Sequence, residues 1–211
     1  MARKQSAVPN FKRSRATVGS SQTKIPGWVW LAGGIVLAVL AVIGLFYLGN
    51  QTAGAVQGDI DGVLIFPDPG RGHRDGELPY TTDVPVGGLH NPEWQNCGIY
   101  DQPVRTENAI HSLEHGAVWI AYQPDLPADQ VETLRALVRE DQAGSQERWV
   151  LLAPKPDLKD PIVATAWRVQ LRLDNASDPR LAQFVRQYQK GPYYPEPGAN
   201  CTFGGIGQPL S

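Results

Sequence analysis

Four histidines are the side chains of this 211-residue chain best suited to chemistry: His73, His90, His111 and His115. The last two lie four residues apart. On a helix with about 100° per residue, Glu107 and Glu114 lie roughly 40° and 60° to one side of His111. His115 lies roughly 40° to the other side. These four side chains therefore project within an arc of about 100° on one helical face.

This arc predicts a metal-binding site. Two imidazoles one turn apart can bind one ion, and neighbouring carboxylates can act as further ligands or orient the imidazoles. Zinc and copper suit imidazole-rich sites best. We expect the ligands to be His111 and His115, completed by His90 and by Glu107 or Glu114. The alternative is a structural network, in which the face is solvated or the histidines bind carbonyls near the helix C-terminus.

The segment from His111 to His115 also matches H-x-x-E-H, the inverted zinc-peptidase signature. In such a zinc-dependent hydrolase, Glu114 would be the catalytic group that activates a zinc-bound water. The chemistry also needs a longer helix and a distal carboxylate ligand, for which the candidates are Glu140, Glu147 and Glu196. Because the helix is expected to end at Gly116, we interpret the match as mostly accidental and favour a binding protein over an enzyme.

Cys97 and Cys201 are the only cysteines. Without C-x-x-C spacing, a structural disulfide is favoured over a thiolate metal ligand or a redox thiol. Pairing them would close a loop of roughly 100 residues, which is worth about 4–5 kcal/mol in chain entropy. The bond would also help to hold the loop of His90 near the helix of His111.

Composition excludes several classes of protein. A chain with 42% hydrophobic residues is not wholly disordered, and a net charge of −2 excludes a strongly basic nucleic-acid binder. The charge is uneven, because residues 1–24 hold six basic side chains and no acidic one. We expect these residues to form a disordered cytoplasmic tail.

Residues 28–48 are uncharged and predict a transmembrane helix. A helix of that length rises about 32 Å, enough to cross a hydrocarbon core of about 30 Å. Basic residues flank only its N-terminal side, which places that end in the cytoplasm. A signal peptide cleaved near residues 53–55 is the alternative, but its apolar region should have only about 7–15 residues. We expect a single-pass anchor in the lipid bilayer of the cell membrane over residues 25–49, a linker at 50–58 and an extracytoplasmic domain at 59–211.

The exported domain is expected to have an α+β fold. Strands are predicted at residues 62–66, 117–122, 148–153 and 162–173, and helices at 106–115, at 129–141 and after Asp178. Asp129 and Glu132 resemble a capping box, and Asp178 with Pro179 is typical of a helix start. This order favours an α/β sandwich-like domain with a mostly antiparallel sheet and helices on one face. The Gly- and Pro-rich loop at 67–103 is expected to be functional or stapled, because it is long for a compact domain.

Several of these segments resemble a bacterial family catalogued as domain of unknown function 3105. The resemblance covers roughly residues 60–200. It rests mainly on four segments: 88–94 (GLHNPEW), 97–100 (CGIY), 103–104 and 111–118 (HSLEHGAV). Further matching residues are Glu107, Thr165-Ala166-Trp167, Phe184, Tyr188 and Pro195-Glu196. The resemblance implies a membrane-anchored, exported domain and no particular activity. From the face that carries the histidines and glutamates, we expect a domain that binds a metal ion or small ligand. The alternative is a non-catalytic accessory subunit of a membrane complex, with a partner protein.

Overall fold

The computed structural model describes residues 26–50 and 54–210. The predicted cytoplasmic tail, residues 1–24, lies outside the described residues, as do residues 51–53 of the predicted linker. The chain divides into two units, residues 1–47 and 48–211. The 24-residue helix α1 (Gly27–Asn50) belongs mainly to the first unit. Among the described residues, no helix has both the length and the apolar character to cross a membrane.

The second unit is built on a seven-stranded mixed sheet. Its strands, in spatial order, are β1 (Val56–Gln57), β2 (Leu64–Ile65), β9 (Val169–Leu173), β8 (Ile162–Ala166), β6 (Val118–Tyr122), β7 (Val150–Pro154) and β5 (Gly98–Ile99). The pairs from β1 to β6 are antiparallel, whereas β6–β7 and β7–β5 are parallel. The α+β class and the antiparallel-rich sheet are thus confirmed. The parallel pair β6–β7 arises because a helix connects these two strands.

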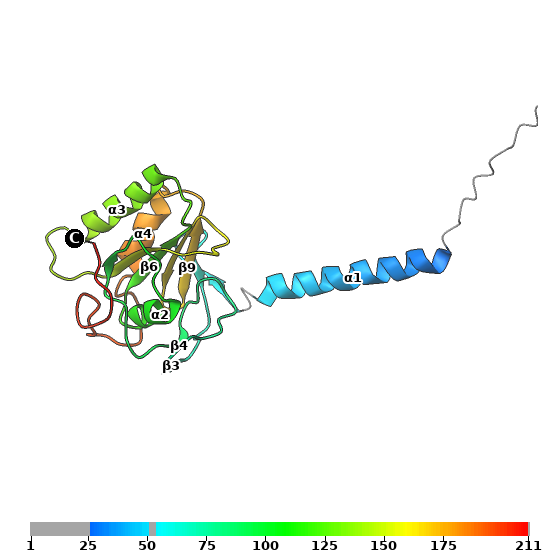
Figure 1. Ribbon diagram of the computed structural model, residues 1–211, viewed down its shortest axis with the longest axis horizontal. Coiled ribbons are helices and arrows are strands. Elements are labelled where there is room, and N and C mark those ends of the chain that lie inside the picture. The colour runs from blue at the N-terminus through cyan, green and yellow to red at the C-terminus, as the bar shows by residue number, and fades with distance from the viewer. Residues whose placement is uncertain (1–25, 51–53, 211) are drawn as a thin grey trace, which may run out of the picture. The chain divides into compact units, whose positions relative to one another are not determined.

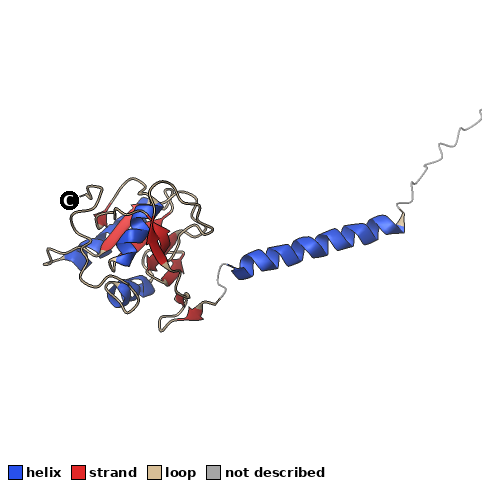
Figure 2. Ribbon diagram, turned by 90° about the horizontal axis from the view of Figure 1, so that it is seen from below, coloured by secondary structure: helices blue, strands red, loops and turns tan. Residues whose placement is uncertain are grey.

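Helices cover both faces of this sheet, so the prediction of helices on one face was wrong (Figure 1). Helices α3 (Ala128–Gln142) and α4 (Pro179–Tyr188) pack on the face that carries Val118 and Ile120 of β6. Helix α2 (Thr106–Glu114) packs on the face that carries Trp119 and Ala121. Side chains alternate across a strand, and all five residues of β6 are buried, which requires a layer on each side. Figure 2 distinguishes the helices and strands by colour.

Two local predictions also need correction. The single strand expected at 162–173 is a hairpin, β8–β9, whose turn contains Arg168 with a φ of 68°. The expected capping box of Asp129 and Glu132 does not form, because α3 begins one residue earlier and Pro127 precedes it without a side-chain cap. The start of α4 is as predicted, since the Asp178 side chain accepts a hydrogen bond from the Arg180 N–H and Pro179 occupies the first turn.

A small second sheet lies within the long loop at 67–103. Strand β3 (Arg71–His73) pairs in parallel with β4 (Gly88–His90), and this register places His73 directly opposite His90. Neither strand was predicted from the sequence, because each has only three residues and contains a glycine. Both strands end at a histidine.

One ion pair fixes this loop to the main sheet and gives a pH-dependent prediction. Burial alone would raise the pKa of Asp83, but hydrogen bonds from Arg172 and the Lys159 N–H, with the Arg172 charge, lower it to about 2. Because the folded pKa lies below the unfolded value of about 3.9, this stabilisation is present above pH 4 and is lost as the pH falls towards 2. We expect Asp83→Asn to lower the free energy of unfolding by about 2 kcal/mol at pH 7. Urea unfolding should show the difference from wild type vanishing near pH 2; a constant difference would contradict this origin.

Candidate metal site

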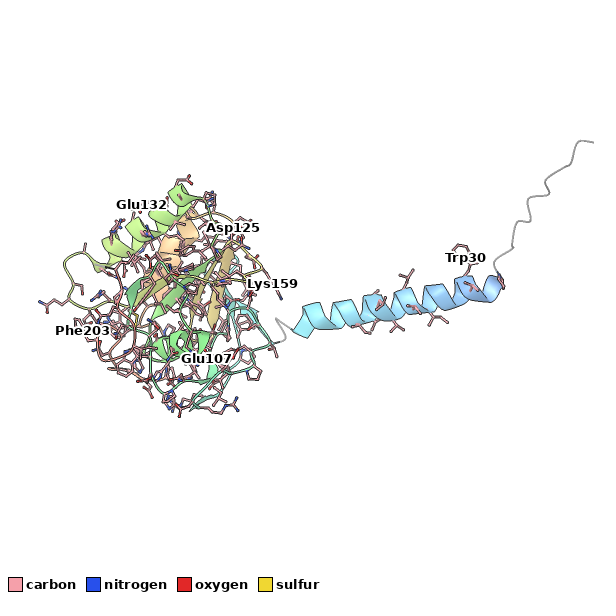
Figure 3. All side chains as sticks on the ribbon, in the orientation of Figure 1. Trp30, Glu107, Asp125, Glu132, Lys159 and Phe203 are labelled. Atoms are coloured by element: carbon pink, nitrogen blue, oxygen red, sulfur yellow. A yellow bond between two sulfur atoms is a disulfide. The ribbon has the colours of Figure 1, made fainter. Side chains whose placement is uncertain are left out.

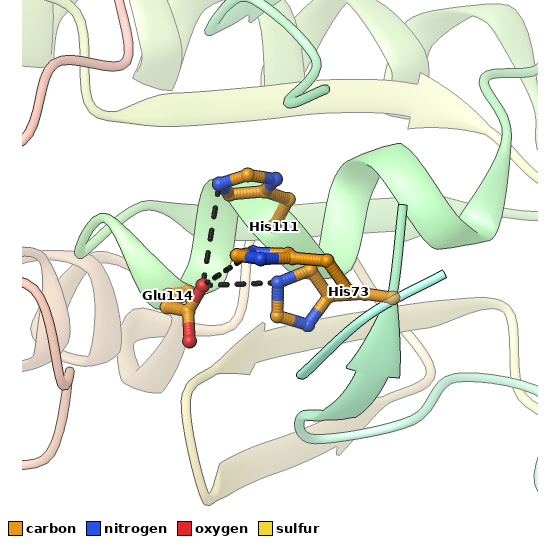
Figure 4. Close-up of side chains that lie close together, drawn as sticks. His73, His111 and Glu114 are labelled. Carbon is orange, nitrogen blue, oxygen red and sulfur yellow. Dashed lines mark hydrogen bonds and ion pairs between the residues drawn. The ribbon is translucent and has the colours of Figure 1, made fainter. Parts of the chain in front are cut away.

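Three chain segments bring the candidate ligands together. His111 and Glu114 lie on α2, and His115 follows its last residue. His90 ends β4 and His73 ends β3. Figure 4 shows the His73 and His111 side chains near the Glu114 carboxylate, with dashed lines from the rings to one of its oxygens. The site is therefore assembled where the small sheet meets the C-terminal half of α2.

The Glu114 carboxylate is the centre of a first cluster, which we define as His73, His90, His111 and Glu114. Its Oε2 atom lies 2.9 Å from Nε2 of His90, 3.4 Å from Nε2 of His73 and 4.0 Å from Nε2 of His111. The three ring centroids are 4.7–4.9 Å apart. His90 is wholly buried and Glu114 almost so, whereas the His73 side chain is 45% exposed. The four side chains thus converge on one point that solvent reaches from the His73 side.

A second cluster consists of His111, His115 and Glu196. Nε2 of His115 lies 3.6 Å from Oε2 of Glu196, whose side chain is 42% exposed. The backbone N–H of Glu196 donates a hydrogen bond to the carbonyl of Glu114, which fixes the C-terminal segment beside the end of α2. Glu196 was one of three distal acids considered from the sequence, and it is the one that lies at the histidines.

Backbone carbonyls hold three of the imidazoles in one tautomer. Nδ1 of His90, His111 and His115 lies 2.7 Å from the carbonyl oxygens of Gly88, Asn91 and Asn200, respectively. A carbonyl oxygen only accepts hydrogen bonds, so each Nδ1 carries the hydrogen. In the neutral ring, Nε2 then presents a lone pair towards the cluster. This arrangement, with Nδ1 bound to a carbonyl and Nε2 turned inward, is typical of metal-ligating histidines.

The contact between His90 and Glu114 needs a positive charge. With its hydrogen on Nδ1, a neutral His90 presents an acceptor at Nε2, and an ionised Glu114 is also an acceptor. Two acceptors 2.9 Å apart repel unless a proton or a metal ion lies between them. Because His90 and Glu114 are both buried, the proton or metal ion that lies between them has a large effect on the stability of the folded domain.

The electrostatics favour neutral His111 and His115 rings near an ionised Glu114 carboxylate. Burial lowers the pKa of His111, the hydrogen bond to the Asn91 carbonyl opposes this, and the neighbouring histidines reinforce it, so that the pKa falls to about 4. Burial also lowers the pKa of His115. Burial raises the pKa of Glu114, but the His90 hydrogen bond and the surrounding histidines outweigh it, so the pKa falls below its usual value. Neutral histidine and ionised glutamate are the forms that bind metals.

Polar side chains of α2 fix the loop that supplies the carbonyl bound to His111. The Asn108 amide donates to the Glu93 carbonyl at 2.6 Å, and the Ser112 hydroxyl donates to the Gln95 carbonyl at 2.6 Å. These buried contacts hold residues 91–95 against the helix, and with them the Asn91 carbonyl that orients His111. Ser112 and Asn108 are thus positioning residues that the sequence analysis did not identify.

The predicted disulfide between Cys97 and Cys201 is present, with Cα atoms 5.3 Å apart. It joins the loop before α2 to the C-terminal segment, as expected. Asn200, whose carbonyl binds His115, precedes Cys201 directly. The disulfide therefore supports the second cluster as well as the loop.

The structure does not bring Glu107 to either cluster. One of its carboxylate oxygens accepts a hydrogen bond from the Leu78 N–H at 2.9 Å, and the other lies 3.7 Å from the Arg105 guanidinium. Figure 3 shows Glu107 among the side chains around α2. The contact with the Leu78 N–H fixes the chain around residue 78 to α2. The remaining predicted ligands, His90, His111, His115 and Glu114, are brought together.

His73 is the cluster residue that sequence reasoning missed. It lies 17 residues before His90 with no helical or strand periodicity to connect the two. The available signal was weak: Arg71-Gly72-His73 and Gly88-Leu89-His90 are both short segments that contain a glycine and end in histidine. Only the parallel register makes that similarity meaningful.

Gly116, which ends the helix region with a φ of 105°, gives a second stability prediction. A Cβ atom here would lie 3.0 Å from the Tyr194 ring and 3.3 Å from Cα of Lys190. We expect Gly116→Ala to cost about 1–3 kcal/mol in unfolding free energy from backbone strain, with the close contacts added. Gly144→Ala is the matched control in urea unfolding, since its φ is 76° but a Cβ would meet nothing within 4 Å. Equal losses in the two variants would show that the Tyr194 contact is unimportant.

Comparison with known proteins gives a family but no activity. No curated protein and no solved structure matches the chain significantly. The profile of the family described as a protein of unknown function (DUF3105) matches residues 73–203, more than half of the chain. The matched segment includes both clusters and both cysteines. The chain therefore belongs to the DUF3105 family.

Proposed function

We propose that this domain binds a divalent transition-metal ion through the first cluster, with His73, His90, His111 and Glu114 as ligands. The observation that carries the proposal is the set of backbone carbonyls that turn Nε2 of His90 and His111 towards Glu114. A metal ion supplies the positive charge that the contact between His90 and Glu114 requires.

Ligand chemistry and spacing favour zinc or copper. Three imidazoles and one carboxylate form a donor set that both metals accept. Ligands about 2.1 Å from a tetrahedral zinc ion lie about 3.4 Å from one another. The contacts of Glu114 with His90, His73 and His111 lie around that value, at 2.9, 3.4 and 4.0 Å. Binding thus requires only small side-chain shifts.

The test is metal retention by the purified full-length chain. Protein stripped with a chelator, loaded with zinc or copper and dialysed should retain about one ion per chain. The variant His90→Ala/Glu114→Gln should retain none, and Glu107→Gln is the matched control, because it removes an equally buried carboxylate on the same helix that belongs to neither cluster. Equal, sub-stoichiometric metal in wild type and the double variant would refute the proposal.

One observation favours a second candidate, a zinc-dependent hydrolase. Glu196 joins His111 and His115 in the second cluster, which gives the His₂Glu ligand set of several zinc hydrolases. Glu114 would then activate the zinc-bound water. This candidate predicts chelator-sensitive turnover of a peptide or ester that disappears in Glu114→Gln while the metal stays bound. Absence of turnover from zinc-loaded wild type over a broad substrate panel would leave the binding function alone.

We also propose that the domain lies outside the cytoplasm and is anchored to the membrane through the uncharged segment of residues 28–48. The disulfide supports export, because such bonds persist in oxidising compartments. The test is protease accessibility in intact spheroplasts and in opened vesicles, with carbonate extraction of the membranes. Protection of the domain in intact spheroplasts, or its release by carbonate, would contradict the respective part of this proposal.

A further inference from the structure

His111 belongs to both clusters, yet it has a single free donor atom. Its Nδ1 is bound to the Asn91 carbonyl at 2.7 Å, and its side chain is only 6% exposed. Only Nε2 remains for a metal ion, and one lone pair binds one ion at a time. A bridging imidazolate would require the buried hydrogen bond to Asn91 to break.

We propose that the two clusters are alternative positions for one ion, which passes between them through His111. This inference rests on the proposed metal binding and extends it from holding an ion to transferring one. The clusters are adjacent, since the His111 and His115 ring centroids lie 4.6 Å apart and Glu196 is hydrogen-bonded to the Glu114 backbone.

Exposure gives each position its own opening to solvent. The first cluster has one half-exposed ligand, His73 at 45%, and the second has Glu196 at 42%. The shared His111 is buried between them. An ion that enters at His73 can therefore leave at Glu196, and an ion that enters at Glu196 can leave at His73. In either direction the two clusters hold only one ion at a time. The partner in such a transfer is a donor or acceptor of divalent transition-metal ions, either a protein or a small chelator.

The test uses copper(II) and electron paramagnetic resonance of the full-length chain. Wild type should bind one copper per chain and give two overlapping signals, one with three and one with two imidazole nitrogens. His73→Ala should remove the three-imidazole signal, which only the first cluster can give, and keep the two-imidazole signal. Glu196→Gln should do the opposite. Both changes are at half-exposed side chains, and circular dichroism confirms that the variants fold; Glu132→Gln, an exposed carboxylate on α3, is the control.

Two outcomes overturn this inference while leaving the proposed function intact. One is binding of two copper ions per chain, since the two clusters would then not compete for the single Nε2 atom of His111. The other is one copper per chain with a single signal that Glu196→Gln leaves unchanged. Wild type that binds no copper would instead remove the proposed function itself.

Discussion

A His111→Ala variant is expected to bind zinc or copper at least about 100-fold more weakly than wild type. Residues that only orient a ligand typically contribute 10–100-fold in affinity, so loss of a ligand should exceed that range. His111 is also the ligand common to both clusters, which leaves the ion no complete alternative position. Competition titration of the full-length chain against a chelating dye measures the loss.

His115→Ala is the comparison that makes this result specific. It removes an imidazole one turn away that belongs only to the second cluster, so the first cluster keeps all its ligands. We expect its affinity loss to be less than about 10-fold, since the ion can still occupy the first cluster. Equal losses in the two variants would mean that the second cluster is the main position, and no loss in either would exclude His111 as a ligand.

Replacing both cysteines by alanine is expected to lower the free energy of unfolding by about 2–5 kcal/mol. The bond connects residues 104 apart, so it removes much freedom from the unfolded chain, and both cysteines are wholly buried. Urea unfolding of Cys97→Ala/Cys201→Ala against oxidised wild type measures the change.

In the same variant, the metal affinity of the second cluster should fall more, relative to wild type, than that of the first cluster. Asn200, which orients His115, is adjacent to Cys201, whereas the partners of His90 and His111 lie in other segments. Reduced wild type is the control and should match the double variant in stability. A loss below about 1 kcal/mol would show that the C-terminal segment is held without the disulfide.

Helical periodicity was sufficient to predict the part of the site that α2 carries. His111 and Glu114 share a face because residues three apart on a helix are neighbours, and Gly116 ends that helix as its conformation predicts. The same periodicity wrongly included Glu107. The angle of a side chain around a helix does not show which other segment packs against it. Here the Leu78 N–H and the Arg105 guanidinium are the partners of the Glu107 carboxylate.

The rest of the site depends on contacts between distant segments. His73 joins His90 through a three-residue parallel ladder, and Glu196 reaches His115 through a hydrogen bond to the end of α2. Neither leaves a local signal in the sequence. The placement of α2 on the second face of the sheet was missed for a related reason, since a strand buried on both sides has no alternation to read.

X-ray absorption at the zinc edge of the zinc-loaded, full-length chain tests most directly whether histidines hold a metal here. We predict at least two, and up to three, imidazole nitrogens with a carboxylate oxygen about 2.0–2.1 Å from zinc, and no sulfur. The imidazole scattering should decrease in His111→Ala. Zinc surrounded only by oxygen atoms, or a spectrum that His111→Ala leaves unchanged, would contradict the assignment of these clusters as a metal site.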